Sequence, residues 1–531
     1  MQDRLGPRGG FEFNGQQTAI PEDTRAVNGF ANAFASFLLD VPSRVGRDLT
    51  VIDPGTRHWA VFSFVHDKWQ VTPKVTIDLG LRHEYYTPLI GLVDQGGLSN
   101  YDPATNTLRV AGYGDVPANL GVKRYFKNFA PRTGLSYRLT DNAVVRAGYG
   151  VSTIPFPDNS YAFNFPVKQN NDFNAPNTFA SAPVHMVDGF PAPILTQIPS
   201  NGIIPAGTPL LQNQRYFAIP SDLHEGNLQS WNVAYQRELP GRLTAEVAYV
   251  GNRGDIVNNI DLNAGFVVGA DNAGRPQFAP FGRTAETTGW MRSNTTYHSL
   301  QTKLDKRFTD GFLLTTSYTL GRSINSWQGT TNGGIPTPAN IALSRGRAEY
   351  DRTHNYTQSF VYLFPFGRDG RWVKSGPASW IIGGWQIAGV FTAQSGQPIN
   401  FTANAATLRA PGNTQRPDAS GTPAILGGIG PGNLWFDTSV FSFPAPNTFG
   451  NVERNALLDG PWFVNLDAAL AKWFTIRGDV KAELRVDAFN LTDRPQFERP
   501  NGEFGNPRFG QITSTIGATE RTIRFGLRVL F

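Results

Sequence analysis

The chain has 531 residues, of which 17% are charged and 12% aromatic, and it carries a formal net charge of +5 and no cysteine. This charged fraction is below the roughly 25% of soluble globular domains. The absence of cysteine excludes disulfides, zinc–thiolate sites and a cysteine nucleophile. The small net charge gives no reason to expect a nucleic-acid partner.

The first residues predict neither a targeting segment nor a spanning helix. The segment MQDRLGPRGGFEFNG lacks the apolar core of a signal peptide. The sequence also contains no run of about 18 apolar residues that would cross a membrane as a helix. Two segments near the start, about 9–15 and 29–40, could each supply a strand.

From residue 59 onward, apolar and polar residues alternate with the period of two that is typical of strands. The strands come in pairs around turns that contain Pro, Asn, Asp or Gly, and one pair has a longer connection. The predicted pairs are 59–71 with 74–86, 129–139 with 143–152, 230–239 with 242–253, 297–308 with 312–323, 354–366 with 385–394, and 464–474 with 479–491. A final strand ends at Phe531.

Long loops rich in Pro, Gly, Asn and Thr separate the pairs, at 88–128, 154–226, 254–295, 326–351, 396–460 and 492–519. Such loops are unusual in a compact soluble domain. Because they alternate with the short turns, one end of the strand set carries turns and the other carries loops. The count is about 15 strands, each near the 9–11 residues that cross a bilayer at a tilt. The sequence therefore predicts an all-β fold, an antiparallel transmembrane β-barrel that is incomplete, with short periplasmic turns and long extracellular loops.

The segment KAELRVDAF shows how the two faces of a strand differ. Its charged residues fall on one face and its apolar residues on the other. This pattern fits a soluble sheet over a core as well as a membrane barrel around a wet lumen, but the strand length and the turn asymmetry favour the barrel. The predicted lumen-facing residues are Lys481, Glu483, Arg485, Asp487, Arg524 and Arg528.

Aromatic residues gather near the predicted strand ends, as they do in the girdles of membrane barrels, where a ring lies between apolar and aqueous zones. The same rings could instead cap a soluble core. The candidates for a girdle are Trp59, Trp69, Tyr85, Trp231, Tyr249 and Trp473.

Five segments together resemble the β-barrel of TonB-dependent outer-membrane receptors, in particular the Oar-like branch with its carboxypeptidase-regulatory-like domain. They are HDKWQVTPKVTIDLGLRHEYYTP, NFAPRTGLSYRLTDNAVVRAGYG, SWNVAYQRELPGRLTAEVAYVGNRG, YHSLQTKLDKRFTDGFLLTTSYTLGRSIN and DAFNLTDRPQFERP. The resemblance implies a bacterial outer-membrane location and energised uptake of an unidentified extracellular ligand. It also implies three kinds of partner, namely outer-membrane lipid, the barrel assembly machinery and the TonB complex.

Complete members of this family also have a signal peptide, an accessory domain, a plug and roughly 22 barrel strands. Residues 1–531 match the barrel alone, so we expect a single β-barrel domain that corresponds to the C-terminal portion of a receptor. Contact with TonB would then run through an N-terminal part that the chain lacks.

The last strand has an unbroken alternation. Barrels of the outer membrane typically end in an aromatic residue preceded by alternating apolar residues, and the resemblance implies that the assembly machinery reads this pattern. The same row is also what the lipid-facing side of a closing strand requires. The residues concerned are Ile523, Phe525, Leu527, Val529 and Phe531.

The remaining polar motifs indicate no catalytic, metal or cofactor site. His66 and Asp67 are neighbours in a strand and point to opposite faces, as do His83 and Glu84. The motif YDRTHNY at 350–356 is best explained as a loop anchor or as part of the barrel mouth. No P-loop, EF-hand, H-E-x-x-H or G-x-S-x-G elbow is present, so we expect no enzyme and no cofactor.

Aromatic residues in the loops could stack on a ligand or pack the loops together. They are Tyr101, Tyr113, Tyr125, Phe126, Tyr161, Phe163, Trp290, Trp327 and Trp435. Two other functions stay open from the sequence: a plug-free, porin-like passive channel, and a secreted β-rich adhesin or glycan-binding module.

Overall fold

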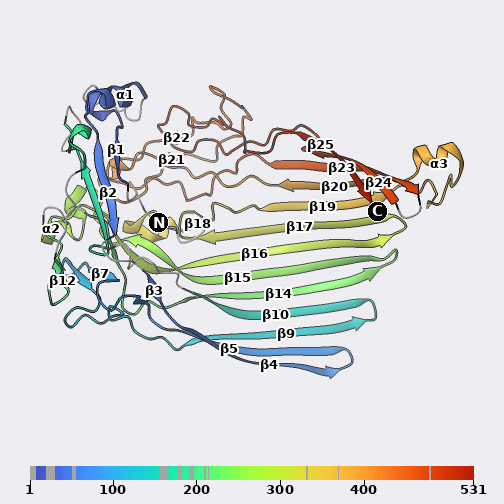
Figure 1. Ribbon diagram of the computed structural model, residues 1–531, viewed down its shortest axis with the longest axis horizontal. Coiled ribbons are helices and arrows are strands. Elements are labelled where there is room, and N and C mark those ends of the chain that lie inside the picture. Colours follow the sequence, from blue (N-terminus) through green and yellow to red (C-terminus); the bar gives the residue numbers. More distant parts are fainter. Residues whose placement is uncertain are drawn as a thin grey trace.

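The computed structural model describes residues 8–19, 30–50, 55–155, 164–175, 181–190, 197–208, 211–212, 214–329, 333–368, 370–477 and 480–531. Thirteen long antiparallel strands form one twisted wall (Figure 1). From one edge to the other they are β25 (Thr522–Leu530), β24 (Val480–Phe489), β23 (Phe463–Arg477), β20 (Trp385–Gln394), β19 (His354–Leu363), β17 (Phe312–Asn325), β16 (Thr287–Thr309), β15 (Leu243–Asp261), β14 (Gly226–Leu239), β10 (Ala143–Ile154), β9 (Asn128–Thr140), β5 (Val75–Tyr86) and β4 (Ala60–Thr72).

Two short strands bring the sheet to 15 strands; they are not the two upstream segments that complete the predicted count of about 15. β13 (Tyr216–Ala218) pairs in parallel with β16, and β18 (Gly346–Arg347) pairs with β17. Within the described residues, β4 and β25 are the two edges of this sheet. The short turns lie at one end of the wall and the long loops at the other (Figure 1), so the predicted asymmetry is present.

The segment near residue 30 corrects one prediction. Residues 30–38 form the helix α1 (Phe30–Leu38) and contribute no strand. Phe30, Phe34 and Phe37 are spaced by three or four residues, which is a helical period, and adjacent rings in this series stack with centroids 5.8 and 6.2 Å apart. The other upstream segment forms β1 (Gly10–Glu12), which belongs to a separate three-stranded sheet.

The register of the wall places apolar residues in continuous rows. Residues directly opposite each other in antiparallel strands project from the same face. One row crosses six strands through Leu135, Ala147, Val233, Tyr249, Leu300 and Leu320. A second row crosses six strands through Phe312, Tyr362, Ile387, Leu470, Val486 and Phe525. We refer to the face that carries these rows as the apolar face and to the opposite one as the polar face.

The buried apolar clusters of the described residues are made largely by the loops. One cluster joins Leu98, Val116 and Trp290, and another packs Phe401, Phe436, Phe441 and Phe509 together. In the second cluster the rings meet mostly edge to face at 4.9 to 6.3 Å, which is a favourable geometry for aromatic pairs. The loop end therefore has an interior of its own.

The loop end also contains short elements, among which two three-stranded sheets and two two-stranded sheets are described. One three-stranded sheet joins β1, β2 (Arg44–Thr50) and β11 (Lys168–Asn174), and the other joins β12 (Ile203–Pro205), β8 (Thr107–Val110) and β7 (Ser99–Asp102). The two-stranded sheets pair β21 (Asp418–Ala419) with β22 (Phe441–Ser442), and β3 (Thr56–Arg57) with β6 (Ile90–Gly91). The helices besides α1 are α2 (Phe278–Phe281), α3 (Gly376–Ile382) and the 3₁₀ turns η1 (Gln16–Thr18), η4 (Met186–Asp188), η5 (Asp271–Gly274), η6 (Pro338–Ser344) and η7 (Ala405–Leu408). In the described part of the chain, no helix has the length and apolar character needed to span a membrane.

Candidate functional site

The final strand β25 lies at one edge of the wall and pairs with β24. Its apolar residues Ile523, Phe525, Leu527 and Val529 stand opposite Ala488, Val486, Leu484 and Ala482. Phe525 is 82% exposed and Phe531, just past the strand, is 98% exposed. This row belongs to the apolar face. Recognition of the row by an assembly machinery stays a prediction.

The charged residues of the last two strands share the polar face and complement each other across the ladder. Glu483 stands opposite Arg528, and Asp487 stands opposite Arg524. Within β24, Arg485 Nε donates to Asp487 Oδ1 at 2.7 Å. Lys481 lies in the same row of β24. Opposite charges facing each other across strands are stabilising, so these residues form a paired charged row, and their exposure to a lumen stays a prediction.

Five of the six girdle candidates lie on the apolar face. Tyr85 pairs with Val61, Trp69 with Ile77, and Trp231 with Gly251. Tyr249 belongs to an apolar row, and its hydroxyl is 2.8 Å from His298 Nδ1. Trp59 precedes β4 and is bonded to Thr87 through both its backbone groups. Trp59 is two residues before Val61, so its side chain projects from the same face as Val61, which is the apolar face.

Trp473 is the exception and corrects the prediction. It pairs with Glu483, so it projects from the same face as the charged row of β24. Its neighbour Phe474 pairs with Ala482 and occupies the apolar face. Because successive side chains alternate, only one of these two adjacent rings can belong to an outward girdle, and the register selects Phe474.

The histidine motifs have structural partners. His66 Nε2 lies 2.9 Å from Asp78 Oδ1, and His83 Nε2 lies 2.9 Å from the carbonyl oxygen of Phe126. Asp67 and Glu84 project from the opposite faces to their histidine neighbours, as alternation requires. Among the described residues, no group of three potential metal-ligating side chains was found.

The YDRTHNY segment anchors its loop, in keeping with the interpretation from the sequence. Asp351 is 3% exposed, accepts from the backbone nitrogen of Ser323 at 2.7 Å and forms an ion pair with Arg347 at 2.9 Å. Arg352 donates to the carbonyl oxygen of Ser395 at 2.7 Å. His354 Nδ1 is 2.8 Å from the Tyr318 hydroxyl.

The loop aromatics divide between packing and exposure. Tyr101, Trp290 and Trp327 are buried, and Tyr113 packs against the cluster around Tyr101. Phe126 stacks on Tyr85 at 4.5 Å, and Tyr125 stacks on His224 at 3.9 Å. Tyr161 and Phe163 lie outside the described residues. Trp435 lines a pocket.

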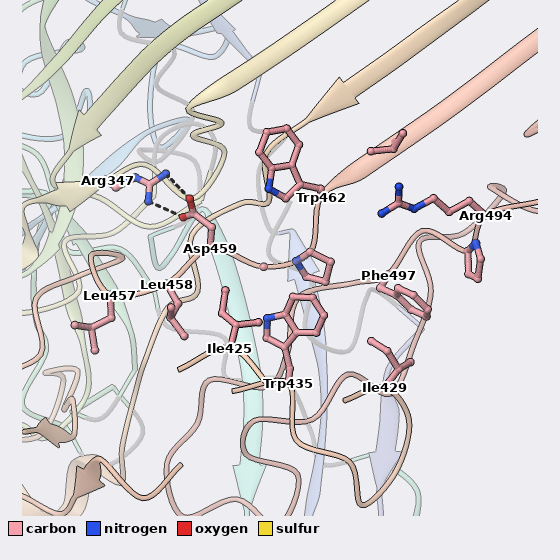
Figure 2. Close-up of a pocket in the computed structure, with 14 residues that line it drawn as sticks. Arg347, Ile425, Ile429, Trp435, Leu457, Leu458, Asp459, Trp462, Arg494 and Phe497 are labelled. Atoms are coloured by element: carbon pink, nitrogen blue, oxygen red, sulfur yellow. Dashed lines mark hydrogen bonds and ion pairs between the residues drawn. The ribbon is translucent and has the colours of Figure 1, made fainter. Parts of the chain in front are cut away.

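This pocket, which we name the loop-end pocket, has a volume of about 740 Å³ and is built by four segments far apart in the sequence (Figure 2). Its lining combines aromatic and aliphatic side chains with two arginines. The lining residues are Arg347, Ile425, Ile429, Trp435, Leu457, Leu458, Asp459, Gly460, Pro461, Trp462, Val464, Arg494, Pro495 and Phe497.

The two arginines of the loop-end pocket differ in their pairing. Arg347 donates to Asp459 at 2.6 Å and to Asp351 at 2.9 Å. Burial lowers the pKa of Arg347, but the hydrogen bonds to Asp459 and Asp351 outweigh burial and hold this pKa above its ordinary value. Arg494 is exposed, and Figure 2 shows its guanidinium extending toward Trp462. Arg494 therefore supplies the cation that a negatively charged ligand could reach.

The register also shows on which side of the wall the loop-end pocket lies. Val464 pairs with Ala393, which pairs with Tyr356, and Tyr356 pairs with Tyr318. The side chains of these residues all project from the apolar face. Trp462 stacks on His354 with centroids 5.8 Å apart, and His354 pairs with Leu320 of an apolar row. Val464 and Trp462 therefore line the pocket from the same side of the wall as the apolar face, at the loop end.

Sequence reasoning identified Trp435 but missed Trp462, Arg347 and Arg494 as members of one site. No local signal links them, since they come from loops separated by more than 20 residues and meet only after the wall aligns the strands that carry those loops. The nearest signal for this pocket in the sequence is the pair Pro461 and Trp462, which lies just before the predicted strand at 464–474.

A family model described as "Outer membrane beta barrel domain" matches residues 1–524. A search of curated proteins finds no match. Among solved structures, the chain is similar to the ferripyoverdine receptor of the outer membrane of Pseudomonas aeruginosa, with 12% identity, a TM-score of 0.41, and coverage of 92% of this chain and 39% of that one. It is also similar to the FrpB iron transporter from Neisseria meningitidis, with 9% identity, a TM-score of 0.40, and coverage of 97% and 50%. The chain thus spans half or less of the length of these two proteins.

Proposed function

This chain belongs to the outer membrane β-barrel domain family, and on that premise we propose that it forms part of the wall and the extracellular mouth of a TonB-dependent, Oar-like receptor. Membership places it in the bacterial outer membrane. The receptor would take up an unidentified extracellular ligand with energy supplied through the TonB complex. Outer-membrane lipid and the barrel assembly machinery are its further proposed partners.

The observation that carries this proposal is the two-faced wall. Its strands have 9 to 23 residues, enough to cross a bilayer. Apolar rows run across one face and a paired charged row lies on the other. In lipid, this arrangement places the apolar rows outward and the charges toward water. The specific assignment to TonB-dependent receptors rests on the resemblance of the five strand motifs.

A passive channel made of these strands alone has weaker support. In the described residues, β4 and β25 are unpaired edges, and each unsatisfied backbone group in hydrocarbon costs several kcal/mol. Further strands between the two edges would satisfy these groups. The edges therefore favour a larger wall to which this chain contributes.

Energised uptake and passive diffusion are separated by a transport assay in the native host. Cells with and without the gene are exposed to small ring-bearing anions, the chemistry that suits the rings and Arg494 of the loop-end pocket, and accumulation is measured before and after a protonophore. Gene-dependent accumulation that stops with the protonophore supports the receptor. Accumulation that continues supports a passive channel. Recovery of the protein in the soluble fraction without detergent would exclude both and leave the secreted adhesin.

The loop-end pocket is tested in the same assay. Trp462→Ala and Arg494→Gln should each lower the accumulation of a transported anion, because they remove a stacking surface and the accessible cation. Phe443→Ala, an exposed loop ring outside the pocket, is the matched control. Unchanged accumulation in both pocket variants would contradict ligand binding in the pocket and leave it a loop-packing feature.

A further inference from the structure

One connection at the turn end of the wall differs from its neighbours. The connections β4–β5, β9–β10, β14–β15, β16–β17 and β23–β24 take two or three residues, whereas β19 and β20 are joined by residues 364–384. This connection contains the helix α3, which projects from the end of the wall at which the short turns lie (Figure 1). Short turns are the rule at the periplasmic end of such barrels, so the extra length calls for a physical explanation.

The connection exposes large apolar side chains. Trp380 is 67% exposed and Ile381 is 62% exposed, and both belong to the last turn of α3. Trp372, ahead of the helix, is 51% exposed. Tryptophan is enriched where an apolar zone meets water at a membrane surface, and a cluster of this kind indicates an interaction surface.

Basic residues accompany these rings. Residues 364–384 contain Arg368, Arg371 and Lys374 against the one acidic residue Asp369. Arg371 and Lys374 are exposed, and the Arg371 guanidinium lies 5.5 Å from the ring centroid of Trp372. Exposed apolar side chains with adjacent cations are characteristic of segments that lie in the interface of an anionic lipid layer.

α3 is held against the apolar face of the wall. Its Trp380 ring lies 5.4 Å from Phe474, which is on that face. Lys472, on the same face, donates through Nζ to the carbonyl oxygens of Ile381 at 2.6 Å and Gly383 at 2.9 Å. A cation at a helix C-terminus satisfies carbonyls that have no partner inside the helix. The exposed Trp380 ring of α3 is therefore continuous with the side of the wall that faces lipid.

We propose that residues 371–382 form an interfacial anchor that inserts Trp372, Trp380 and Ile381 into the periplasmic phospholipid layer, while Arg371 and Lys374 bind anionic phospholipid headgroups. Three features of the segment favour a lipid surface: its continuity with the apolar face, its position at the turn end, and the charge of its basic residues. Lys472 is the positioning residue that holds the anchor on the wall.

The absence of cysteine from the chain makes site-specific labelling direct. Four single-cysteine variants of the full chain, Trp380→Cys, Ile381→Cys, Phe525→Cys and Asp141→Cys, are labelled with an environment-sensitive fluorophore. Each is folded into vesicles of phosphatidylethanolamine and phosphatidylglycerol, with and without lipids brominated on the acyl chain. Phe525 reports on the apolar face, and Asp141 reports on an exposed turn at the same end of the wall as α3.

We expect blue-shifted emission and quenching by brominated lipid at positions 380, 381 and 525, and neither at 141. Labels at 380 and 381 that behave like the one at 141, while 525 is quenched, would overturn the anchor and leave the wall in the membrane; α3 would then be a docking site for a soluble partner. A label at 525 that is not quenched would overturn the membrane placement of the wall and the anchor with it.

The headgroup contact has its own test in the same vesicles. Arg371→Gln combined with Lys374→Gln in the Ile381→Cys background should abolish the increase in quenching that phosphatidylglycerol produces over phosphatidylethanolamine alone. Arg528→Gln, a basic residue of the polar face near the same end, is the matched control and should retain that increase. An increase retained by the double variant would refute the headgroup contact.

Discussion

The wall and the loop end differ in where they place their large apolar side chains. In the loops, large apolar side chains such as Phe436 are fully buried among other rings. On the wall, Phe525, Val233 and Leu470 are exposed on one face of the sheet. A region that is stable in water must bury such groups, because apolar surface in water is costly. A wall in lipid has no such requirement. The difference shows that the boundary between membrane and water runs across the long strands.

The largest expected effect comes from opening a cavity in the loop interior. Phe436→Ala should destabilise the loop end by about 3–5 kcal/mol, the usual cost of truncating a buried phenylalanine. Phe525→Ala, on the apolar face, leaves no cavity and loses only the transfer of the ring from water to lipid, so it should cost clearly less than Phe436→Ala. Limited proteolysis of the loops in detergent measures both. Equal protease resistance of the two variants would contradict the expectation that the loop end depends on a buried interior and the apolar face of the wall does not.

A charge placed on each face of one strand tests the wall. Val233→Arg adds a charge to the apolar face and should cost about 2–4 kcal/mol if the position lies near the bilayer midplane. Asn232→Arg, its neighbour on the polar face, should be close to neutral. Urea titration of the protein folded in vesicles gives both values. A larger cost for Asn232→Arg would reverse the assignment of the faces.

Removal of a buried cation tests how far the loop end behaves like a soluble interior. Arg283 is fully buried and donates to the carbonyl oxygens of Gln212 at 2.6 Å and Gln214 at 2.9 Å, while its guanidinium lies over Tyr101 and Tyr216. Arg283→Met leaves these acceptors without their donor and should cost about 1–3 kcal/mol. The matched control is Arg485→Met on the exposed charged row of the wall, which should cost less. Hydrogen exchange supplies the measurement, at the loop amides for Arg283→Met and at the β24 amides for Arg485→Met.

The smallest effect belongs to an exposed ion pair between two loops. Arg409 donates to Asp271 at 2.6 Å, and this hydrogen bond lowers the pKa of Asp271 below its ordinary value of 3.8. A carboxylate with a lowered folded-state pKa stabilises the folded state above its unfolded pKa, and the contribution is lost as the pH falls through the folded value. Asp271→Asn should therefore leave loop stability nearly unchanged at pH 7, since exposed pairs contribute little, and should reduce the fall in stability below pH 3.8. A large effect at neutral pH would contradict this.

The sequence predicted all thirteen long strands. Each strand has one apolar face and one polar face, so apolar and polar residues alternate along it with a period of two. The predicted strand at 29–40 is wrong, because Phe30, Phe34 and Phe37 follow a helical period and residues 30–38 form a helix. The sequence also placed Trp473 in the girdle. From the sequence, either of the adjacent rings Trp473 and Phe474 could lie on the apolar face. The pairing of Trp473 with Glu483 places Trp473 on the polar face and Phe474 on the apolar face.

The sequence by itself determined the all-β fold, the separation of turns from loops and the two faces of each strand, because these are local consequences of alternation and turn chemistry. Tertiary structure decided what depends on register and on distant loops: the continuous apolar rows, the loop-end pocket around Trp435 and Trp462, and the seating of α3 on Lys472 and Phe474. The physical reason is that such contacts join residues far apart in the chain, and no local pattern encodes which of them meet.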